Sequence, residues 1–280
     1  MSARAAPAGL KAYLGLYLLF LYLPLLLIPL FSFNDSVQAA FPLKGFTLDW
    51  YKALAGNERL GVATLNSLMV ALAASLIATG AGTTIAYAAT RRRGRFAPLF
   101  SALARLPILV PGVILGIGTL ILVNLIGLDP SLTAVTLGHV AFTLPITVTL
   151  IGTRLALVPK TLEEAALDLG AHEWTVLRRI VLPIAAPAIL SAFMLAFVTS
   201  FDEFIVAFFL TGTDATLPVY IWSQLRFPKE LPSVMALGSL VLTASVVLVL
   251  VADRIGRLGL RASSAPAVAV PGTPIPAQGA

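Results

Sequence analysis

Two adjacent carboxylates, Asp202 and Glu203, stand in the apolar stretch TSFDEFIVAFFLTG, which holds no lysine or arginine. Insertion scales put the cost of an aspartate at the middle of a membrane helix at about 2.5–3.5 kcal/mol, and less near the interface. A polar partner, a water-filled cavity or a cationic ligand usually offsets such a cost. The pair is therefore a candidate for binding a cation inside a membrane.

A polar stripe is predicted on the same segment. If the segment is helical, Ser191, Thr199 and Asp202 fall within an arc of about 80°. Glu203 lies about 100° further round, so the two acids need not face the same cavity. Three orientations of Asp202 stay open: it lines a cation-favouring path, it binds a helix N-terminus or a basic residue of a partner chain, or it faces lipid.

We do not expect this chain to be an enzyme. Acid–base catalysis needs two groups that face each other, and no second acid lies in another apolar segment. His139 is expected to make a helix-packing hydrogen bond rather than relay protons, and Arg105 is expected to snorkel or to pair. The chain has no phosphate-binding G-x-x-x-x-G-K-[ST] pattern and no cysteine. We therefore expect no catalytic residue, no metal and no cofactor on this chain, and an ATPase would have to be another subunit.

The segments around these residues are long enough to cross a membrane. Of the 280 residues, 58% are hydrophobic and 11% are charged, whereas soluble domains carry about 25% charged residues. Because about 20 apolar residues cross the hydrocarbon core, we predict an all-α integral membrane protein with six spans. The predicted spans are Ala12–Phe33, Val62–Thr90, Ala97–Ile126, Leu132–Leu157, Ile184–Leu210 and Ser233–Val251.

Small residues and prolines refine this picture. Gly80 and Gly82, with Ala78 and Ala81, would let helices approach closely in the second span. Prolines inside or near the spans predict kinks, which membrane bundles tolerate when neighbours satisfy the freed carbonyls. These prolines are Pro107, Pro111, Pro145 and Pro187.

Lysine and arginine predict the orientation, because they concentrate on the cytoplasmic side. With the N-terminus inside, thirteen of them fall in the cytoplasmic segments and five in the outer loops. Both termini are then cytoplasmic, with residues 1–11 as the N-terminal segment and 12–261 as the membrane domain. The uncharged Ala/Pro/Ser/Gly-rich segment 262–280 reads as a disordered cytoplasmic tail. The net charge of +6 is accounted for by topology, so nucleic acid is not an expected partner.

A charged insert, residues 159–183, separates the fourth and fifth spans on the cytoplasmic side. Thr161 and Glu164 fit a capping box, and Gly170 is placed to end the helix in the left-handed conformation. Leu162, Ala165, Ala166 and Leu169 form one apolar stripe on this short helix. A second helix from about His172 should carry Trp174, Leu177 and Val181 on one side and stop at Pro183. An acidic helix with a small-residue face fits a protein groove better than anionic lipid.

The insert resembles the cytoplasmic EAA loop of bacterial ABC-importer permeases. The pattern in that family is EAA, three residues, Gly, nine residues, then Ile-x-Leu-Pro. The residues that match it here are Glu164, Ala165, Ala166, Gly170, Ile180, Leu182 and Pro183. The resemblance implies a type I importer fold, in which this loop is the coupling helix that docks on a separate ATPase subunit holding ATP and Mg²⁺. The expected docking residues are those seven together with Thr161 and Leu169.

Other segments are similar to permeases of the spermidine/putrescine type. They are YLPLLLIPLFSFNDS, SFDEFIVAFFLTG and TLPVYIW, and the resemblance extends up to about Gly259. It implies a polyamine as solute, which carboxylates and aromatic faces would suit. The aromatic candidates are Phe201, Phe204, Tyr220 and Trp222.

The resemblance also implies further partners: a second, homologous permease, an extracytoplasmic solute-binding protein, membrane lipid and the bacterial inner membrane itself. Two alternatives remain for the function. One is a permease for another organic solute, such as an opine, an amino-acid-like compound or a phosphonate. The other is an ion-coupled secondary carrier, which would have no use for a coupling helix.

Overall fold

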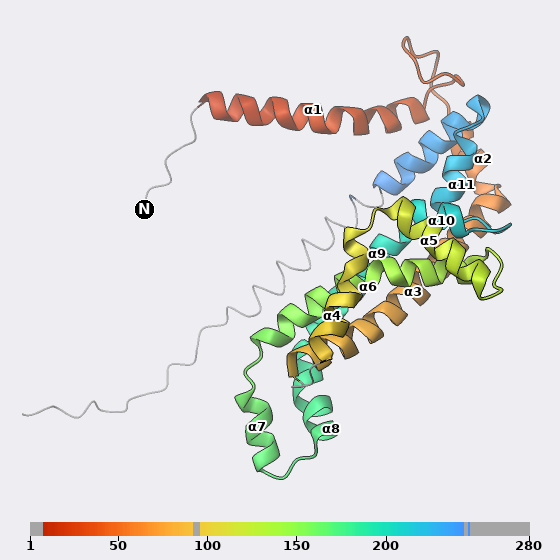
Figure 1. Ribbon diagram of the computed structural model, residues 1–280. Helices are drawn as coiled ribbons and strands as arrows, with labels where there is room; N and C mark the ends of the chain where they lie inside the picture. Colours follow the sequence, from red (N-terminus) through yellow and green to blue (C-terminus); the bar gives the residue numbers. More distant parts are fainter. Residues whose placement is uncertain (1–7, 92–95, 244–245, 247–280) are drawn as a thin grey trace, which may run out of the picture. The chain divides into compact units, whose positions relative to one another are not determined.

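The computed structural model describes residues 8–91, 96–243 and 246. Within these, the regular secondary structure is helical, and one isolated bridge joins Asn34 and Phe46 (Figure 1). The chain divides into two compact units, one of residues 1–54 and 229–280 and the other of residues 55–228. The first unit contains α1 (Ala8–Ser32), most of α2 (Asp49–Ala55) and a helix over 231–243. The second contains α3 (Glu58–Arg91), α4 (Ala97–Arg105), α5 (Gly112–Leu125), α6 (Leu132–Leu157), α7 (Thr161–Asp168), α8 (Glu173–Val176), α9 (Leu182–Phe201), α10 (Ile205–Leu210) and α11 (Leu217–Gln224).

Four of the described helices are long and apolar enough to cross a membrane. They are Gly9–Ser32, Glu58–Arg91, Leu132–Leu157 and Glu173–Phe201. A bent pair, Leu99–Leu109 with Gly112–Leu125, gives a fifth if it counts as one span. The predicted sixth span begins in the helix over 231–243, but most of its second half lies outside the described residues, as does the predicted tail 262–280. Six spans therefore stay a prediction.

The third predicted span, Ala97–Ile126, is wrong as a continuous helix. The chain runs through α4 and a 3₁₀ turn (Leu106–Leu109), and then bends by 115° before α5. Val110 is extended, with φ −90° and ψ 125°. Pro111 follows it, and a proline disfavours the helical conformation in the residue before it. The expected kink is a full break.

The fifth predicted span, Ile184–Leu210, is also broken. Helix α9 ends at Phe201, residues 202–204 are not helical, and α10 begins at Ile205. Asp202 and Glu203 lie in this break. At its other end the helix starts earlier than predicted, because α8 continues through a π-helical turn (Leu177–Val181) into α9.

The core of the second unit is built from α3, α6 and α9, which contact one another. Small residues make this possible: Ala74 and Ala78 of α3 and Ala192 and Ala196 of α9 have no exposed surface. Helices with such faces approach closely, so that polar side chains bond across them. The Thr147 hydroxyl on α6 donates to the carbonyl of Ala78 at 2.9 Å.

In the first unit, α1 keeps its apolar side chains exposed, with Phe20 at 80% and Tyr13 at 68%. A surface of this kind is stable only in lipid or against another chain. The loop after α1 folds around the buried Asn34, whose Oδ1 accepts from the Lys44 amide at 2.9 Å and whose carbonyl accepts from the Trp50 indole at 2.9 Å.

Candidate coupling and translocation sites

Helix α7 and the turn after it carry the predicted docking residues. The capping box is wrong, because Lys160 is the N-cap and makes no side-chain capping bond. Lys160 already has helical angles, φ −64° and ψ −25°, whereas a capping side chain needs its residue in the extended region. Thr161 is therefore the first helical residue. The prediction for Gly170 is confirmed, since its φ is +84°, a conformation that favours glycine.

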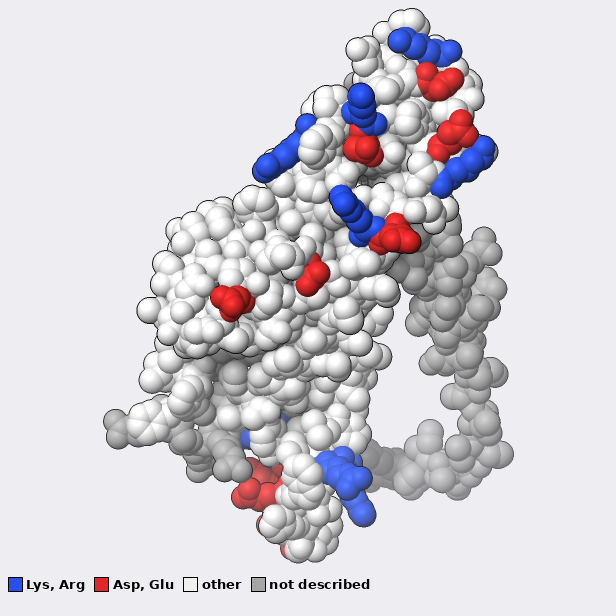
Figure 2. Space-filling model, turned by 90° about the vertical axis from the view of Figure 1, so that its right-hand side faces the viewer, with Lys and Arg blue, Asp and Glu red and all other residues white. Residues whose placement is uncertain are grey.

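The apolar stripe of α7 is largely uncovered. Leu162 is 46% exposed and Leu169 is 89% exposed, and Ala165 is exposed as well. Ala166 is the exception, because it packs against the buried apolar cluster of α3, α6 and α9. Acidic and basic side chains lie at the end of the second unit that carries α7 and α8, and other charged side chains lie elsewhere on the same face (Figure 2). The described chain therefore presents an acidic helix with an open apolar side.

The end of the predicted motif lies inside a continuous helix. Ile180 packs against the same apolar cluster, and Pro183 follows the π-helical turn without stopping the helix. In a regular helix the proline ring clashes with the carbonyl four residues earlier. Here the Leu182 amide bonds to the Leu177 carbonyl five residues earlier, and this shift of register accommodates the proline. The prediction that Pro183 ends the second helix is wrong.

The residues predicted to share one side of that second helix differ in how deeply they are buried. Val181 is fully buried, whereas Trp174 is 61% exposed. Trp174 and Leu177 line a cavity of about 840 Å³ between α3 and α9, together with Thr79, Tyr87 and Phe193 among others. This cavity is apolar, and no acid lines it.

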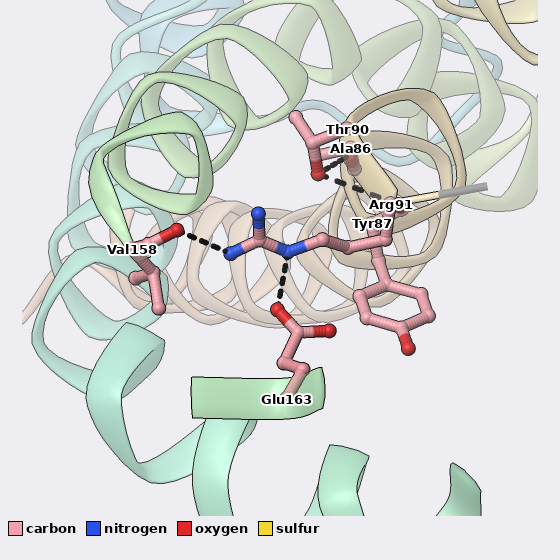
Figure 3. Close-up of polar contacts among 6 residues, drawn as sticks. All are labelled: Ala86, Tyr87, Thr90, Arg91, Val158 and Glu163. Atoms are coloured by element: carbon pink, nitrogen blue, oxygen red, sulfur yellow. Dashed lines mark hydrogen bonds and ion pairs between the residues drawn. The ribbon is translucent and has the colours of Figure 1, made fainter. Parts of the chain in front are cut away.

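Sequence reasoning missed one contact of α7. Glu163 turns inward and forms an ion pair of 2.7 Å with Arg91 at the end of α3 (Figure 3). From the sequence, Arg91 is predicted only to lie among the thirteen basic residues of the cytoplasmic side. Neither spacing nor periodicity links residues in helices so far apart along the chain, so no sequence signal could have paired them.

The two acids of the α9–α10 break differ in their contacts. Glu203 is partly buried, and its Oε1 accepts the amide hydrogen of Val206 at 3.0 Å, which satisfies an unpaired donor at the start of α10. Asp202 is exposed and follows the last residue of α9, and its carboxylate makes no hydrogen bond or ion pair within the described chain. The break therefore occupies one carboxylate and leaves the other available.

The aromatic candidates fall into separate places. Phe204 contacts Trp222 of α11, with ring centroids 5.4 Å apart, directly after the two acids. Phe201 stacks on Phe197 along α9 at 6.3 Å. Tyr220 accepts a hydrogen bond from Asn57 at 2.8 Å and lines a different, polar cavity of about 470 Å³ that also contains Glu58 and Asp214.

Ser191 and Thr199 of the predicted polar stripe both lie on α9. Ser191 is exposed, but its hydroxyl donates to the Pro187 carbonyl at 2.8 Å. Thr199 is half-buried. Since Asp202 follows the last turn of α9 with helical angles, φ −89° and ψ −2°, the stripe extends to the break.

His139 belongs to α6, and Arg105 lies beside this helix. His139 is buried, and its Nδ1 lies 2.8 Å from the Ser200 hydroxyl of α9, a helix-packing hydrogen bond as predicted. Arg105 ends α4 with an exposed side chain that lies close to Gly152 of α6. Among the described residues, no group of three histidine, aspartate or glutamate side chains is placed to hold a metal ion.

Comparison with known proteins agrees with this geometry. Residues 78–258 match the family described as binding-protein-dependent transport system inner membrane component. The spermidine/putrescine transport system permease protein PotC of Escherichia coli K12 is 34% identical over 239 residues, covering 85% of this chain and 90% of PotC. The putrescine transport system permease protein PotI of the same organism is 35% identical over 234 residues, covering 80% of this chain and 82% of PotI.

Solved structures share the fold. A chain of a bacterial ABC transporter involved in import of the acidic polysaccharide alginate superposes with a TM-score of 0.66 at 15% identity, covering 91% of this chain and 99% of that chain. A chain of the MetNI methionine ABC transporter superposes with a TM-score of 0.59 at 20% identity, covering 71% and 95%. At these identities the similarity concerns the fold alone.

Proposed function

The chain belongs to the family of binding-protein-dependent transport system inner membrane components, and on this premise we propose that it forms part of the translocation path of an ATP-driven polyamine importer. It is a permease subunit in the inner membrane. The assignment of a polyamine as the solute rests on the similarity to PotC and PotI over at least 80% of the chain. The Asp202 carboxylate, which has no partner among the described residues, supports this assignment.

The proposed topology has six spans and both termini in the cytoplasm. Its support is the excess of lysine and arginine in the segments 1–11, 91–96, 153–183 and 252–261. This orientation places α7 and Gly170 inside the cell and the α9–α10 break towards the outer half of the membrane. Residues 12–261 then form the membrane domain.

The α7 helix and the following turn are the proposed docking site for the ATPase. Support comes from the match to the EAA pattern and from the uncovered apolar side, on which Leu169 is 89% exposed. ATP and Mg²⁺ would bind to the partner, because the chain has no phosphate-binding glycine–lysine loop. A second permease and an external binding protein complete the assembly.

A polyamine suits the chemistry of the break. Each ammonium group of a polyamine can pair with a carboxylate and lie over an aromatic face. Asp202 offers the first, and the pair of Phe204 and Trp222 directly after it offers the second. We assign Glu203 to the fold of the break, because its carboxylate is bound to the Val206 amide.

The docking proposal can be tested by cross-linking, because the chain has no cysteine. Leu169→Cys should cross-link to the ATPase in the purified complex, whereas Thr213→Cys, in the loop between α10 and α11, should not. Deletion of 163–170 or Gly170→Asp should abolish co-purification of the ATPase. Retention of the ATPase and of transport in both variants would contradict the docking site.

The solute proposal can be tested by uptake of labelled putrescine or spermidine into proteoliposomes. A hydrogen bond to a charged group is worth about 1.5–3 kcal/mol, or roughly 10- to 150-fold in affinity, so Asp202→Asn should weaken uptake within that range. Asp129→Asn, which removes an exposed loop carboxylate, is the matched control. Unchanged uptake in Asp202→Asn removes this residue from the path, and transport of an anion instead removes the polyamine assignment.

A further inference from the structure

A buried ion pair joins α7 to the end of a membrane span. Arg91 is the last residue of α3, and its Nε lies 2.7 Å from Oε1 of Glu163. The two side chains are only 5% and 13% exposed. The same guanidinium donates through Nη2 to the carbonyl of Val158 at 2.9 Å. Figure 3 shows Arg91 reaching between these two partners.

The arginine thereby connects three segments. Val158 follows the last residue of α6 and is extended, with φ −79° and ψ 122°, so its carbonyl is free of the helical ladder. Glu163 lies in the first turn of α7. The contact with Val158 is a hydrogen bond, whereas Nε and Oε1 of Glu163 are close enough for an ion pair but are not aligned as a hydrogen bond. The guanidinium therefore links the ends of α3 and α6 to the start of α7.

Apart from the ion pair, α7 contacts mainly α8 and the π-helical turn, and its Ala166 packs against the apolar cluster. A charge left unpaired in a buried site is strongly unfavourable, so α7 cannot swing away from α3 without exposing or orphaning both charges. The ion pair therefore constrains the position of α7 relative to the end of α3.

Neighbouring acids of α7 have no such partner. Glu164 and Asp168 are exposed, and neither forms an ion pair within the described chain. The pairing is therefore specific to Glu163, which lies on the side of the helix that faces Arg91. It is not a general attraction between an acidic helix and a basic helix end.

We propose that Arg91 and Glu163 are positioning residues that transmit movement of α7 to α3 and α6, and so couple the ATPase cycle to opening of the path. This inference rests on the proposed docking of the ATPase on α7. A docked partner that shifts α7 pulls on the end of α3 through the pair and on the end of α6 through Val158. Without the pair, α7 can follow the ATPase while the spans stay still.

The test compares Glu163→Gln, Arg91→Met, the exchanged pair Arg91→Glu with Glu163→Arg, and the control Arg154→Gln, which removes an exposed cation from α6. The purified complex is reconstituted in proteoliposomes, and putrescine uptake and ATP hydrolysis are measured on the same sample. Coupling between sites is typically worth about 5- to 150-fold, so we expect the putrescine taken up per ATP hydrolysed to fall about tenfold in both single variants. The exchanged pair should recover part of this loss, and Arg154→Gln should lose none.

A cross-link separates this inference from the docking proposal. Each variant also carries Leu169→Cys, and the yield of cross-link to the ATPase is measured. A retained cross-link with unchanged uptake per ATP overturns the coupling role and leaves docking intact. No cross-link in the chain that is otherwise unchanged overturns docking and this inference together. Loss of assembly in every variant of the pair, without recovery on exchange, means that the residues serve folding alone and also overturns it.

Discussion

Replacing Gly82 by alanine should loosen the packing of α3 against α6. A Cβ at this position would lie 2.8 Å from Cβ of Thr147 and 3.2 Å from its backbone carbonyl carbon, and would also clash with the Thr147 hydroxyl. Rotation of the threonine side chain moves only the hydroxyl and the methyl group, so it cannot relieve the contacts with Cβ and the backbone. The two helices must therefore move apart.

The expected change in the free energy of unfolding combines overpacking, a stretched hydrogen bond and helix propensity. Overpacking of a tight interior site typically costs about 1–3 kcal/mol. Separation would also stretch the 2.9 Å bond from Thr147 to the Ala78 carbonyl, and hydrogen bonds between membrane helices average about 0.6 kcal/mol. Alanine is favoured over glycine in a helix by about 1 kcal/mol. We therefore expect a net loss of about 1–2 kcal/mol.

The chain supplies a matched control two residues away. A Cβ added at Gly80 would meet nothing within 4 Å, so Gly80→Ala should gain about 0.5–1 kcal/mol from helix propensity alone. Thermal unfolding of the purified protein in detergent measures both variants, and 1 kcal/mol corresponds to about 2–4 °C in Tm for chains of 150–250 residues. Gly82→Ala should unfold several degrees below Gly80→Ala. Equal unfolding temperatures would refute the close approach of α3 and α6 at Gly82.

Three further substitutions test single contacts. Gly170→Ala forces alanine into a left-handed backbone conformation, which costs about 1–2 kcal/mol. An added Cβ would meet nothing within 4 Å, so the backbone strain alone should weaken co-purification of the ATPase, without a change in detergent solubility. Ser200→Ala leaves Nδ1 of the buried His139 without its 2.8 Å partner, which should lower the free energy of unfolding by about 1–3 kcal/mol. Ser191→Ala, at an exposed site, should cost less in thermal unfolding. Equal losses would contradict the role of the buried bond. Glu203→Ala frees the Val206 amide and should lower the Tm by an amount corresponding to about 1 kcal/mol, whereas Glu203→Gln keeps an oxygen acceptor and should stay closer to the parent.

The lengths of the apolar segments in the sequence predicted much of the helical framework. The fourth predicted span coincides with α6 (Leu132–Leu157), and α3 lies within a few residues of the second. The left-handed Gly170 was also predictable, because a glycine after an amphipathic helix is a local signal. These features depend on residues that are close in sequence, where periodicity and turn chemistry are informative.

The breaks in the third and fifth spans were not predictable from hydropathy. An average over about 20 residues cannot distinguish one helix from two short helices joined by a bend. The prolines near position 110 did signal a kink, but its angle of 115° depends on how α5 packs. In the fifth span no proline or glycine marks residues 202–204. The feature that accompanies this break is the hydrogen bond that the Glu203 carboxylate accepts from the Val206 amide, and only the structure shows it.

The two adjacent pairs of acids in this chain follow one physical rule. In each pair one carboxylate is bound within the chain, Glu163 by Arg91 and Glu203 by the Val206 amide. The other carboxylate, Glu164 or Asp202, is exposed and has no side-chain partner within the described chain. Glu163 and Glu164 point about 100° apart on α7, and Glu203 lies in the non-helical break after Asp202, so each pair can hold the local structure with one member and present the other to a different molecule. Replacing Glu163 or Glu203 by alanine should therefore lower the unfolding temperature, whereas neutralising Glu164 or Asp202 should change binding to the ATPase or the solute while the unfolding temperature stays the same.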